Sequence, residues 1–200
     1  MTEPIPQGAT IGILGGGQLG RMLSVAASRL GLRCHVYEPG EAPPAGHVAD
    51  AVTTAPYEDT AALEAFAASV DVITYEFENI PTAALDTLQA LCPIRPGREA
   101  LRVSQDRLTE KTFLTDLGLK TAPFADITDA QSLTQALEII GAPSILKTRR
   151  FGYDGNAARG QCHTVPEKGS LTQRRSYVED NYQVVESFAY TRAGMLRPHR

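Results

Sequence analysis

The sequence Gly15-Gly16-Gly17-Gln18-Leu19-Gly20 contains the first residues whose types and spacing could bind a ligand. It follows an apolar run at 10–14 and leads into a helical pattern, which predicts a strand, a tight turn and a helix start. Backbone N–H groups and the positive end of the helix dipole at such a turn attract a phosphate. We expect Gly15 to allow the turn, Gly17 to let an anion approach, and Gly20 to let the helix and the strand pack closely.

Glu38 lies at the end of the next predicted strand, 18 residues after Gly20. In a dinucleotide enzyme this acid would hold a ribose hydroxyl group. The turn and Glu38 therefore leave three interpretations open: an NAD-dependent oxidoreductase, a site for another phosphate ligand, and a turn with a purely structural role.

Two carboxylates, Glu76 and Glu78, follow the strand predicted at 71–75. Open α/β sheets bind ligands at the carboxyl ends of their strands, so these side chains could line a site. The alternative is a solvated strand end in which Asn79 caps the helix predicted at 81–91.

The second half of the chain carries a group of cations. Lys147 lies in a strand predicted at 144–148 and stands before Arg149-Arg150-Phe151-Gly152-Tyr153-Asp154-Gly155. A lysine beside a glycine-containing loop can grip polyphosphate while the loop folds over the nucleotide, and the alternative is a hairpin turn with exposed basic residues. Ser104 or Asp106 can cap a helix whose start carries Arg107, and a guanidinium there could point at a phosphate. The alternative is a surface helix with solvated charges.

The elements that position these residues alternate along the first half of the chain. Strands predicted at 33–37, 51–54 and 71–75 alternate with helices predicted at 60–69 and 81–91, which indicates a parallel sheet with helices on both faces. The helix after the glycine turn places five apolar residues on one face: Leu19, Met22, Leu23, Ala26 and Leu30. The stretch 92–97 then leads out of the first domain, and an amphipathic helix follows at 129–140. We predict two domains, 1–96 and 97–200.

The composition excludes some classes of function. The 200 residues carry a net charge of −4, which gives no strong field for nucleic acid or an anionic membrane. No apolar run approaches the roughly 18 residues of a membrane span, and the first residues lack the pattern of a signal peptide. Cys34, Cys92 and Cys162 are too widely spaced for a metal motif, so we expect reduced thiols and a cytoplasmic protein.

Four motifs occur in order: 15–22 (Gly-Gly-Gly-Gln-Leu-Gly-Arg-Met), 74–79 (Thr-Tyr-Glu-Phe-Glu-Asn), Asp106-Arg107 followed by Lys111, and 147–155. Together they resemble the N5-carboxyaminoimidazole ribonucleotide synthases, a family of ATP-grasp enzymes. The resemblance runs from about Thr10 to Gly155, and four motifs in register are more specific than the glycine turn alone.

The resemblance implies an α/β fold, in which a Rossmann-like pre-ATP-grasp domain precedes the start of an ATP-grasp (α+β) domain. It implies a ligase of purine biosynthesis that uses ATP and Mg²⁺. ATP would phosphorylate bicarbonate to carboxyphosphate, which would carboxylate the exocyclic amine of 5-aminoimidazole ribonucleotide. Full-length relatives would be expected to form homodimers. The glycine turn would then serve this substrate, and Glu38 would lose its ribose role.

The resemblance also assigns residues. The ATP-binding residues would be Arg107, Lys147, Gly152, Tyr153, Asp154, Gly155 and Glu186. The substrate, through its phosphate and ribose side and its ring, would be held by Gly16, Gly17, Gln18, Leu19, Glu76, Tyr153 and Asp154. No metal ligand is assigned within the chain.

The chain departs from the family after Gly155. A Lys-Gly-Gln run would follow, but the sequence reads Asn-Ala-Ala-Arg-Gly-Gln at 156–161 and gives no pattern at 162–175. The resemblance returns in a strand at 183–188, and 191–200 is basic and featureless. We expect a chain that stops before the lobe with the magnesium ligands, has little activity alone, and leaves the strand at 183–188 as an exposed sheet edge. A non-catalytic, ligand-binding remnant is the remaining alternative.

Overall fold

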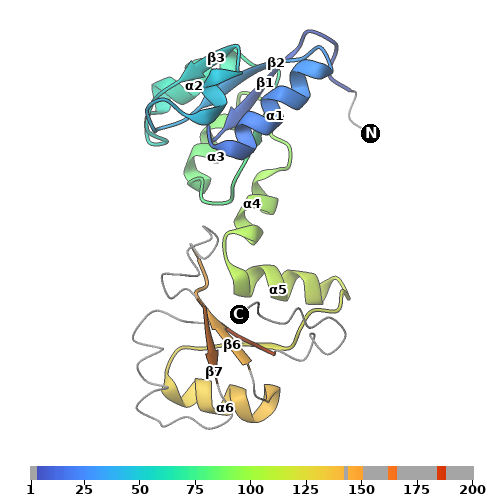
Figure 1. Cartoon of the computed structure of the whole chain (residues 1–200), viewed down its shortest axis with the longest axis vertical. Coiled ribbons are helices and arrows are strands. Elements are labelled where there is room, and N and C mark those ends of the chain that lie inside the picture. The colour runs from blue at the N-terminus through green and yellow to red at the C-terminus, as the bar shows by residue number, and fades with distance from the viewer. Residues whose placement is uncertain (1–3, 142–143, 151–161, 166–183, 188–200) are drawn as a thin grey trace, which may run out of the picture. The chain divides into compact units, whose positions relative to one another are not determined.

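The computed structural model describes residues 4–141, 144–150, 162–165 and 184–187, and it divides into two compact units, Met1–Arg102 and Val103–Arg200 (Figure 1). Each unit has its own four-stranded sheet. In the described part of the chain, no helix is long and apolar enough to cross a membrane.

The sheet of the first unit contains β1 (Thr10–Leu14), β2 (Arg33–Tyr37), β3 (Ala51–Thr53) and β4 (Val72–Tyr75). Its order is β3-β2-β1-β4 and all neighbouring strands are parallel, as the alternating pattern predicted. Since β1 is central, the carboxyl ends of β1, β2 and β4 meet at one edge, and the glycine turn, Glu38 and Glu76 all follow strands that end there.

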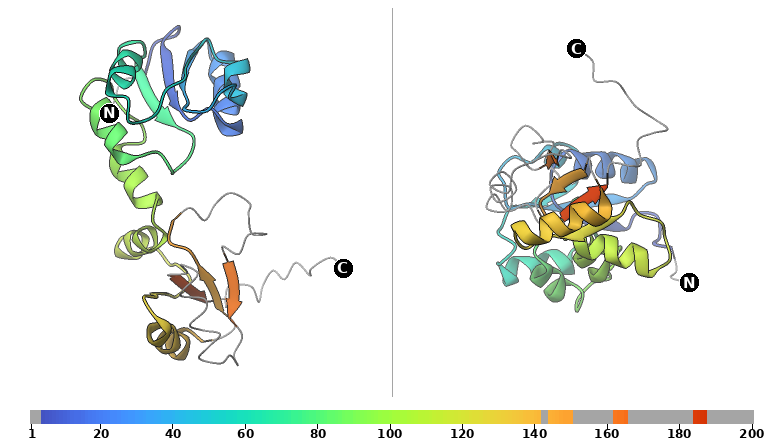
Figure 2. Two further views of the ribbon diagram at one scale, coloured as in Figure 1. Left: turned by 90° about the vertical axis from the view of Figure 1, so that its left-hand side faces the viewer. Right: turned by 90° about the horizontal axis from the view of Figure 1, so that it is seen from below.

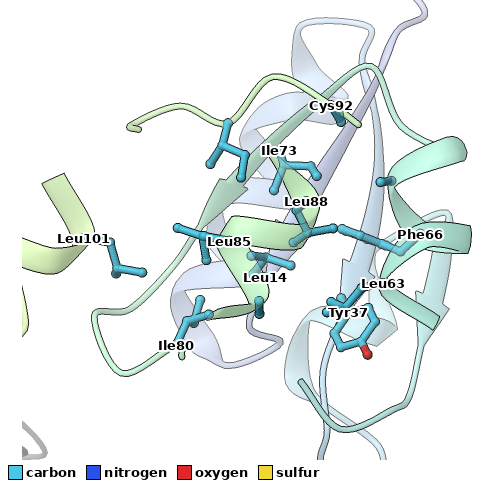
Figure 3. Packing of buried hydrophobic residues seen from close by; sticks show 13 residues of the cluster. Leu14, Tyr37, Leu63, Phe66, Ile73, Ile80, Leu85, Leu88, Cys92 and Leu101 are labelled. Carbon is cyan, nitrogen blue, oxygen red and sulfur yellow. The ribbon is translucent and has the colours of Figure 1, made fainter. Parts of the chain in front are cut away.

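Helices cover both faces of this sheet. Successive residues of a strand point to opposite faces, so neighbouring residues of β1 pack against different helices. Ile13 packs with Ala27 of α1 (Gln18–Arg29) in one cluster. Leu14 packs in another cluster with α2 (Thr60–Ala68) and α3 (Thr82–Leu88). Figure 3 shows Leu85 and Leu88 of α3 lying close to Leu14 in this second cluster. A short 3-10 helix, η1 (Pro44–His47), contributes Ala45 to the first cluster.

Helix α1 meets the sheet through small residues. Gly20, Ser24 and Ala27 are its buried positions, whereas the five apolar residues predicted to share a face are exposed to solvent: Leu19, Met22, Leu23, Ala26 and Leu30. A Cβ atom on Gly20 would lie 2.8 Å from the Gly15 carbonyl oxygen, so glycine lets the helix start pack this closely. The prediction for Gly20 is therefore confirmed.

The boundary between the two units falls within α4 (Arg98–Ser104). The second unit contains α5 (Arg107–Asp116) and α6 (Ala130–Ile140). Its strands are β5 (Phe124–Asp126), β6 (Ser144–Lys147), β7 (Cys162–Val165) and β8 (Val184–Ser187). They form an antiparallel sheet in the order β5-β8-β6-β7 (Figure 2). Leu133 and Ala136 of α6 pack against Leu146 of β6 in the core of this unit.

One expectation about the elements is corrected, and two elements were not predicted. The strand predicted at 183–188 is not a sheet edge, because β8 pairs with β5 on one side and β6 on the other. Residues 162–165, which show no recognisable pattern in the sequence, form β7 by pairing along β6. Helix α4 at 98–104 was not predicted. Cys34 and Cys92 are buried free thiols, as expected, and burial raises the pKa of each.

Candidate functional site

The glycine turn begins where β1 ends. Gly15 has φ of +97°, a conformation that side chains rarely adopt, so the predicted role of Gly15 in a tight turn is confirmed. Its N–H group donates to the Tyr37 carbonyl at the end of β2, which ties the turn to the neighbouring strand. The first turn of α1 follows at Gln18 and contains no acidic residue of its own.

The N–H groups of this turn donate hydrogen bonds to two carboxylates that follow the ends of other strands. Glu76 accepts hydrogen bonds from the N–H groups of Gly17, at 2.6 Å, and of Gly20. Glu38 accepts from Gly16 at 2.7 Å and, through its other oxygen, from Gly40 at 2.9 Å. The N–H groups of Gly16, Gly17 and Gly20, for which the sequence predicted a phosphate, thus bond to carboxylates of the chain itself in this structure.

Glu76 supplies the negative charge that the positive end of the α1 dipole favours. A Cβ atom on residue 17 would lie 2.8 Å from the Glu76 carboxylate, so only glycine lets the anion approach this closely. The alternative that Glu76 is a solvated strand end is therefore wrong. In the related alternative, Asn79 would cap the next helix, but the N-cap residue of α3 is Pro81.

A pocket of about 320 Å³ opens beside the turn. Its lining residues come from the turn, from the segment after β2 and from the end of β4: Gly16, Gly17, Glu38, Gly40, Glu41, Ala42, Pro43, Pro44, Glu76 and Phe77. Three of them are glutamates and none is a lysine, arginine or histidine. The described wall is therefore acidic, and it favours hydroxyl, amine or other hydrogen-bond donors over a phosphate.

The carboxylates of Glu38 and Glu76 also affect the pKa of Tyr57. Its hydroxyl group is buried and has no partner in good hydrogen-bond geometry within the described chain, although the Gly15 backbone lies close enough to act weakly on it. Burial raises its pKa strongly, and the carboxylates of Glu38 and Glu76 act in the same direction. Its ring stacks on Tyr37, with 5.5 Å between the ring centroids.

The cationic residues of the second unit gather where α5 begins and β6 ends. Asp106 is the N-cap residue of α5, and its carboxylate accepts from the Thr109 N–H group at 3.0 Å. Arg149 donates to both oxygens of the same carboxylate. The Arg107 N–H group donates to the Arg149 carbonyl at 2.9 Å. These contacts bring the start of α5, which carries Arg107, close to the segment that follows Lys147.

Burial disfavours ionisation of Asp106, but the hydrogen bonds from Arg149 and Thr109 outweigh this effect and hold its pKa below the ordinary value. The interpretation of this helix start as a set of solvated charges is therefore wrong for Asp106. The sequence contained the partners, but they are 43 residues apart, so only the fold could pair them.

The remaining predicted ATP-side residues are placed only in part. Lys147 ends β6, where its backbone pairs with Cys162 of β7 and Val184 of β8. Glu186 lies in β8 at the position paired with Ile145 and Phe124. The predicted loop, Gly152 to Gly155 with Tyr153 and Asp154, lies outside the described residues.

The predicted substrate-side residues divide into two groups. Gly16, Gly17 and Glu76 line the pocket together. Gln18 and Leu19 begin α1 with exposed side chains and do not line it. Glu38, which the resemblance had set aside, forms part of the wall, and its position at a strand end was the available signal. Among the described residues, no cluster of acidic, histidine or cysteine side chains is arranged to hold a metal ion.

Two family models match the chain: the ribonucleotide synthetase preATP-grasp domain at residues 8–105 and the ATP-grasp domain at 112–192. Among curated proteins, N5-carboxyaminoimidazole ribonucleotide synthase from Brucella melitensis is 50% identical over 148 residues, which are 74% of this chain and 41% of that protein. The chain spans about half the length of the curated relatives it matches.

Solved structures agree with this likeness. N5-carboxyaminoimidazole synthetase from Staphylococcus aureus, complexed with ADP, has a TM-score of 0.82 and 38% identity, and the match covers 92% of this chain and 48% of that one. N5-carboxyaminoimidazole synthase from Aspergillus clavatus, in complex with ADP and 5-aminoimidazole ribonucleotide, has a TM-score of 0.76 and 25% identity, over 91% and 47% of the two chains.

Proposed function

Because the chain belongs to the N5-carboxyaminoimidazole ribonucleotide synthase family of ATP-grasp ligases, we propose that it contributes to the ATP-dependent carboxylation of 5-aminoimidazole ribonucleotide with bicarbonate. Its share of the reaction is a substrate pocket in the first unit and part of a nucleotide site in the second. The observation that best supports this proposal is the hydrogen-bonded pocket around Gly17 and Glu76, because it combines a predicted glycine turn with a predicted strand-end acid.

The substrate-side assignment follows from the charge of the pocket. A ribose offers hydroxyl donors and the aminoimidazole offers an amine, and both can donate to the carboxylates of Glu38 and Glu76. A phosphate at Gly16 and Gly17 would have to displace those carboxylates and would meet a third glutamate, Glu41. We therefore assign the ribose and ring side of the substrate to this pocket. The resemblance assigns further substrate contacts to Gln18, Leu19, Tyr153 and Asp154.

The nucleotide-side assignment uses the cations of the second unit. Arg107 and Lys147 can offset the negative charge of ATP phosphates, Arg107 as a planar guanidinium and Lys147 as a point charge. Gly152 to Gly155 would cover the nucleotide, and Glu186 would lie on its adenine side. Mg²⁺ would offset charge on the transferring phosphoryl group when bound. No described residue is assigned to it, since none forms a suitable acidic cluster.

Ligand-induced thermal stabilisation tests the proposal. A ligand that binds the folded chain raises its unfolding temperature, so 5-aminoimidazole ribonucleotide and ADP should each do so. NADH is the comparator, and stabilisation by NADH alone would refute the ligase assignment and restore the oxidoreductase. Glu76→Gln should reduce the shift produced by the ribonucleotide but not the shift produced by ADP, because Glu76 lies in the pocket of the first unit.

Turnover separates two outcomes of this test. Binding of both ligands with formation of the carboxylated product would establish a ligase, whereas binding without turnover would favour a ligand-binding remnant. We also propose a cytoplasmic location, as the cysteine pattern indicates, and a homodimer for the full-length family, as the resemblance implies. Light scattering tests whether the 200-residue chain keeps this state: a mass of two chains would support the homodimer, and a mass equal to one chain of 21.5 kDa would show that this part of the protein does not dimerise.

A further inference from the structure

Asp106 stands out by its burial. Within the described ranges it is the only aspartate, glutamate, lysine or arginine classed as buried, with 6% of its surface exposed. Burying a carboxylate is unfavourable unless it is paired and hydrogen-bonded. The groups that form ion pairs and hydrogen bonds with Asp106 therefore indicate the role of this side chain.

The main partner of Asp106 is Arg149. The guanidinium donates from Nε to the two carboxylate oxygens at 3.1 and 3.0 Å, and its terminal nitrogen donates to one oxygen at 3.0 Å and forms an ion pair with the other at 2.9 Å. This is the two-pronged geometry in which arginine binds a carboxylate most strongly. Arg150 adds a longer contact of 3.5 Å to the same carboxylate.

The same carboxylate also holds the start of α5. It accepts from the Thr109 N–H group at 3.0 Å and from the Thr109 hydroxyl at 3.2 Å, which caps the helix. The Arg107 N–H group donates to the Arg149 carbonyl at 2.9 Å. Side-chain and backbone contacts thus join two segments that are far apart in the sequence.

These contacts lie next to both predicted phosphate-binding cations. Arg107 directly follows Asp106, and Lys147 stands two residues before Arg149. A shift of the α5 start relative to the end of β6 would move one cation with respect to the other. Two charges that act on one polyphosphate must keep their spacing, because misplacement weakens their joint effect.

We infer that Asp106 is a positioning residue of the nucleotide site, whose paired carboxylate fixes Arg107 relative to Lys147. This inference rests on the proposed nucleotide site. Asp106 is assigned no contact with the nucleotide, and it acts through its pairing with Arg149. Arg149 in turn belongs to the segment that leads into 151–155.

Asp129 provides a matched control for Asp106. It is the N-cap residue of α6 and accepts from the Ser132 N–H group at 2.6 Å, in the same manner as Asp106 caps α5. Its side chain is exposed, and it forms no ion pair within the described part of the chain. Asparagine also caps helices well, so Asp→Asn at either position preserves the cap and removes the charge.

The test measures ADP affinity of the 200-residue chain by titration calorimetry, at a temperature where circular dichroism shows each variant folded. Asp106→Asn should weaken ADP binding by about 10-fold or more, the scale on which outer-shell partners act, whereas Asp129→Asn should not. Arg149→Lys should retain more affinity than Arg149→Met, since it keeps the charge. Unchanged ADP affinity in folded Asp106→Asn would overturn the inference.

Hydrogen exchange gives a second readout that needs no nucleotide. The Arg107 amide should exchange faster in Asp106→Asn than in Asp129→Asn, because its bond to Arg149 depends on the pairing. Equal Arg107 exchange in the two variants would refute the positioning role. A wild-type chain that binds no ADP would refute the proposed nucleotide site, and exchange alone would then decide whether Asp106 fixes Arg107. If Asp106→Asn does not fold, Arg149→Lys and Arg149→Met carry both measurements.

Discussion

Replacing Gly15 with alanine should destabilise the first unit much more than the same change at Gly8. Both residues have positive φ, +97° at Gly15 and +85° at Gly8, so each alanine meets a backbone penalty of about 1–2 kcal/mol. At Gly8 the added Cβ has no atom within 4 Å. At Gly15 it would lie 2.5 Å from Cγ of Glu76 and 3.0 Å from Cδ1 of Phe77.

The difference between the two variants therefore measures the contact with Glu76. Relief of the clash requires this side chain to move, which weakens its hydrogen bonds to Gly17 and Gly20. Overpacking costs about 1–3 kcal/mol and a hydrogen bond to a charged group is worth about 1.5–3 kcal/mol. We expect an excess of about 2–4 kcal/mol for Gly15→Ala over Gly8→Ala.

Thermal unfolding followed by far-ultraviolet circular dichroism measures this excess, since the chain contains no tryptophan. In a domain of about 100 residues each kcal/mol shifts the melting temperature by about 4–8 °C, so Gly15→Ala should melt at least about 8 °C below Gly8→Ala. Gly118→Ala is a control in the second unit, because its φ is +78° and its Cβ would also meet nothing. Equal shifts at Gly8 and Gly15 would refute the packing of Glu76 against the turn.

Four further predictions concern single side chains. Glu76→Gln should lower the free energy of unfolding by about 1–3 kcal/mol, measured by urea denaturation, because a carboxylate acceptor for two N–H groups is lost. Tyr57→Phe should be nearly neutral or stabilising in the same assay, since its buried hydroxyl has no partner in good hydrogen-bond geometry within the described chain, and the Gly15 backbone acts on it only weakly. Tyr37→Phe should cost about 1 kcal/mol, because that hydroxyl donates to the Pro56 carbonyl at 2.6 Å, and the reverse ranking of the two would contradict the geometry. Asp106→Asn should lower the free energy of unfolding by about 1–3 kcal/mol at neutral pH, because the hydrogen bonds from Arg149 and Thr109 then lose their charged acceptor. The pKa of Asp106 is depressed in the folded state, so its contribution is complete above the ordinary value of about 3.9 and is lost as the pH falls through the lower folded pKa. A difference between wild type and Asp106→Asn that persists in strong acid would contradict this assignment.

Local patterns predicted the elements of the first unit well. The glycine turn, the strands that end at residues 37 and 75, and the helix start at 60 each depend on neighbours along the chain, and the structure contains them all. β7 could not be predicted in this way, because residues 162–165 have no strong pattern and become a strand by pairing with β6.

The face of α1 shows where periodicity alone is insufficient. The apolar residues share one face, but the helix packs through Gly20, Ser24 and Ala27 on another. Small residues allow the closest approach of a helix to a sheet, and hydrophobic spacing does not reveal this. Periodicity therefore identified the helix correctly but not the side that packs on the sheet.

The sequence by itself determined the order of the elements, the turn that binds an anion and the family to which the chain belongs, because these depend on residue types at short, fixed spacings. Only the tertiary structure decided which groups meet. Glu76 accepts hydrogen bonds from the N–H groups of Gly17 and Gly20, which lie 59 and 56 residues earlier in the chain, and Arg149 pairs with Asp106 across 43 residues. The packing of strands and helices brings such charged groups together, and a local sequence pattern contains no information about partners so far apart in the chain.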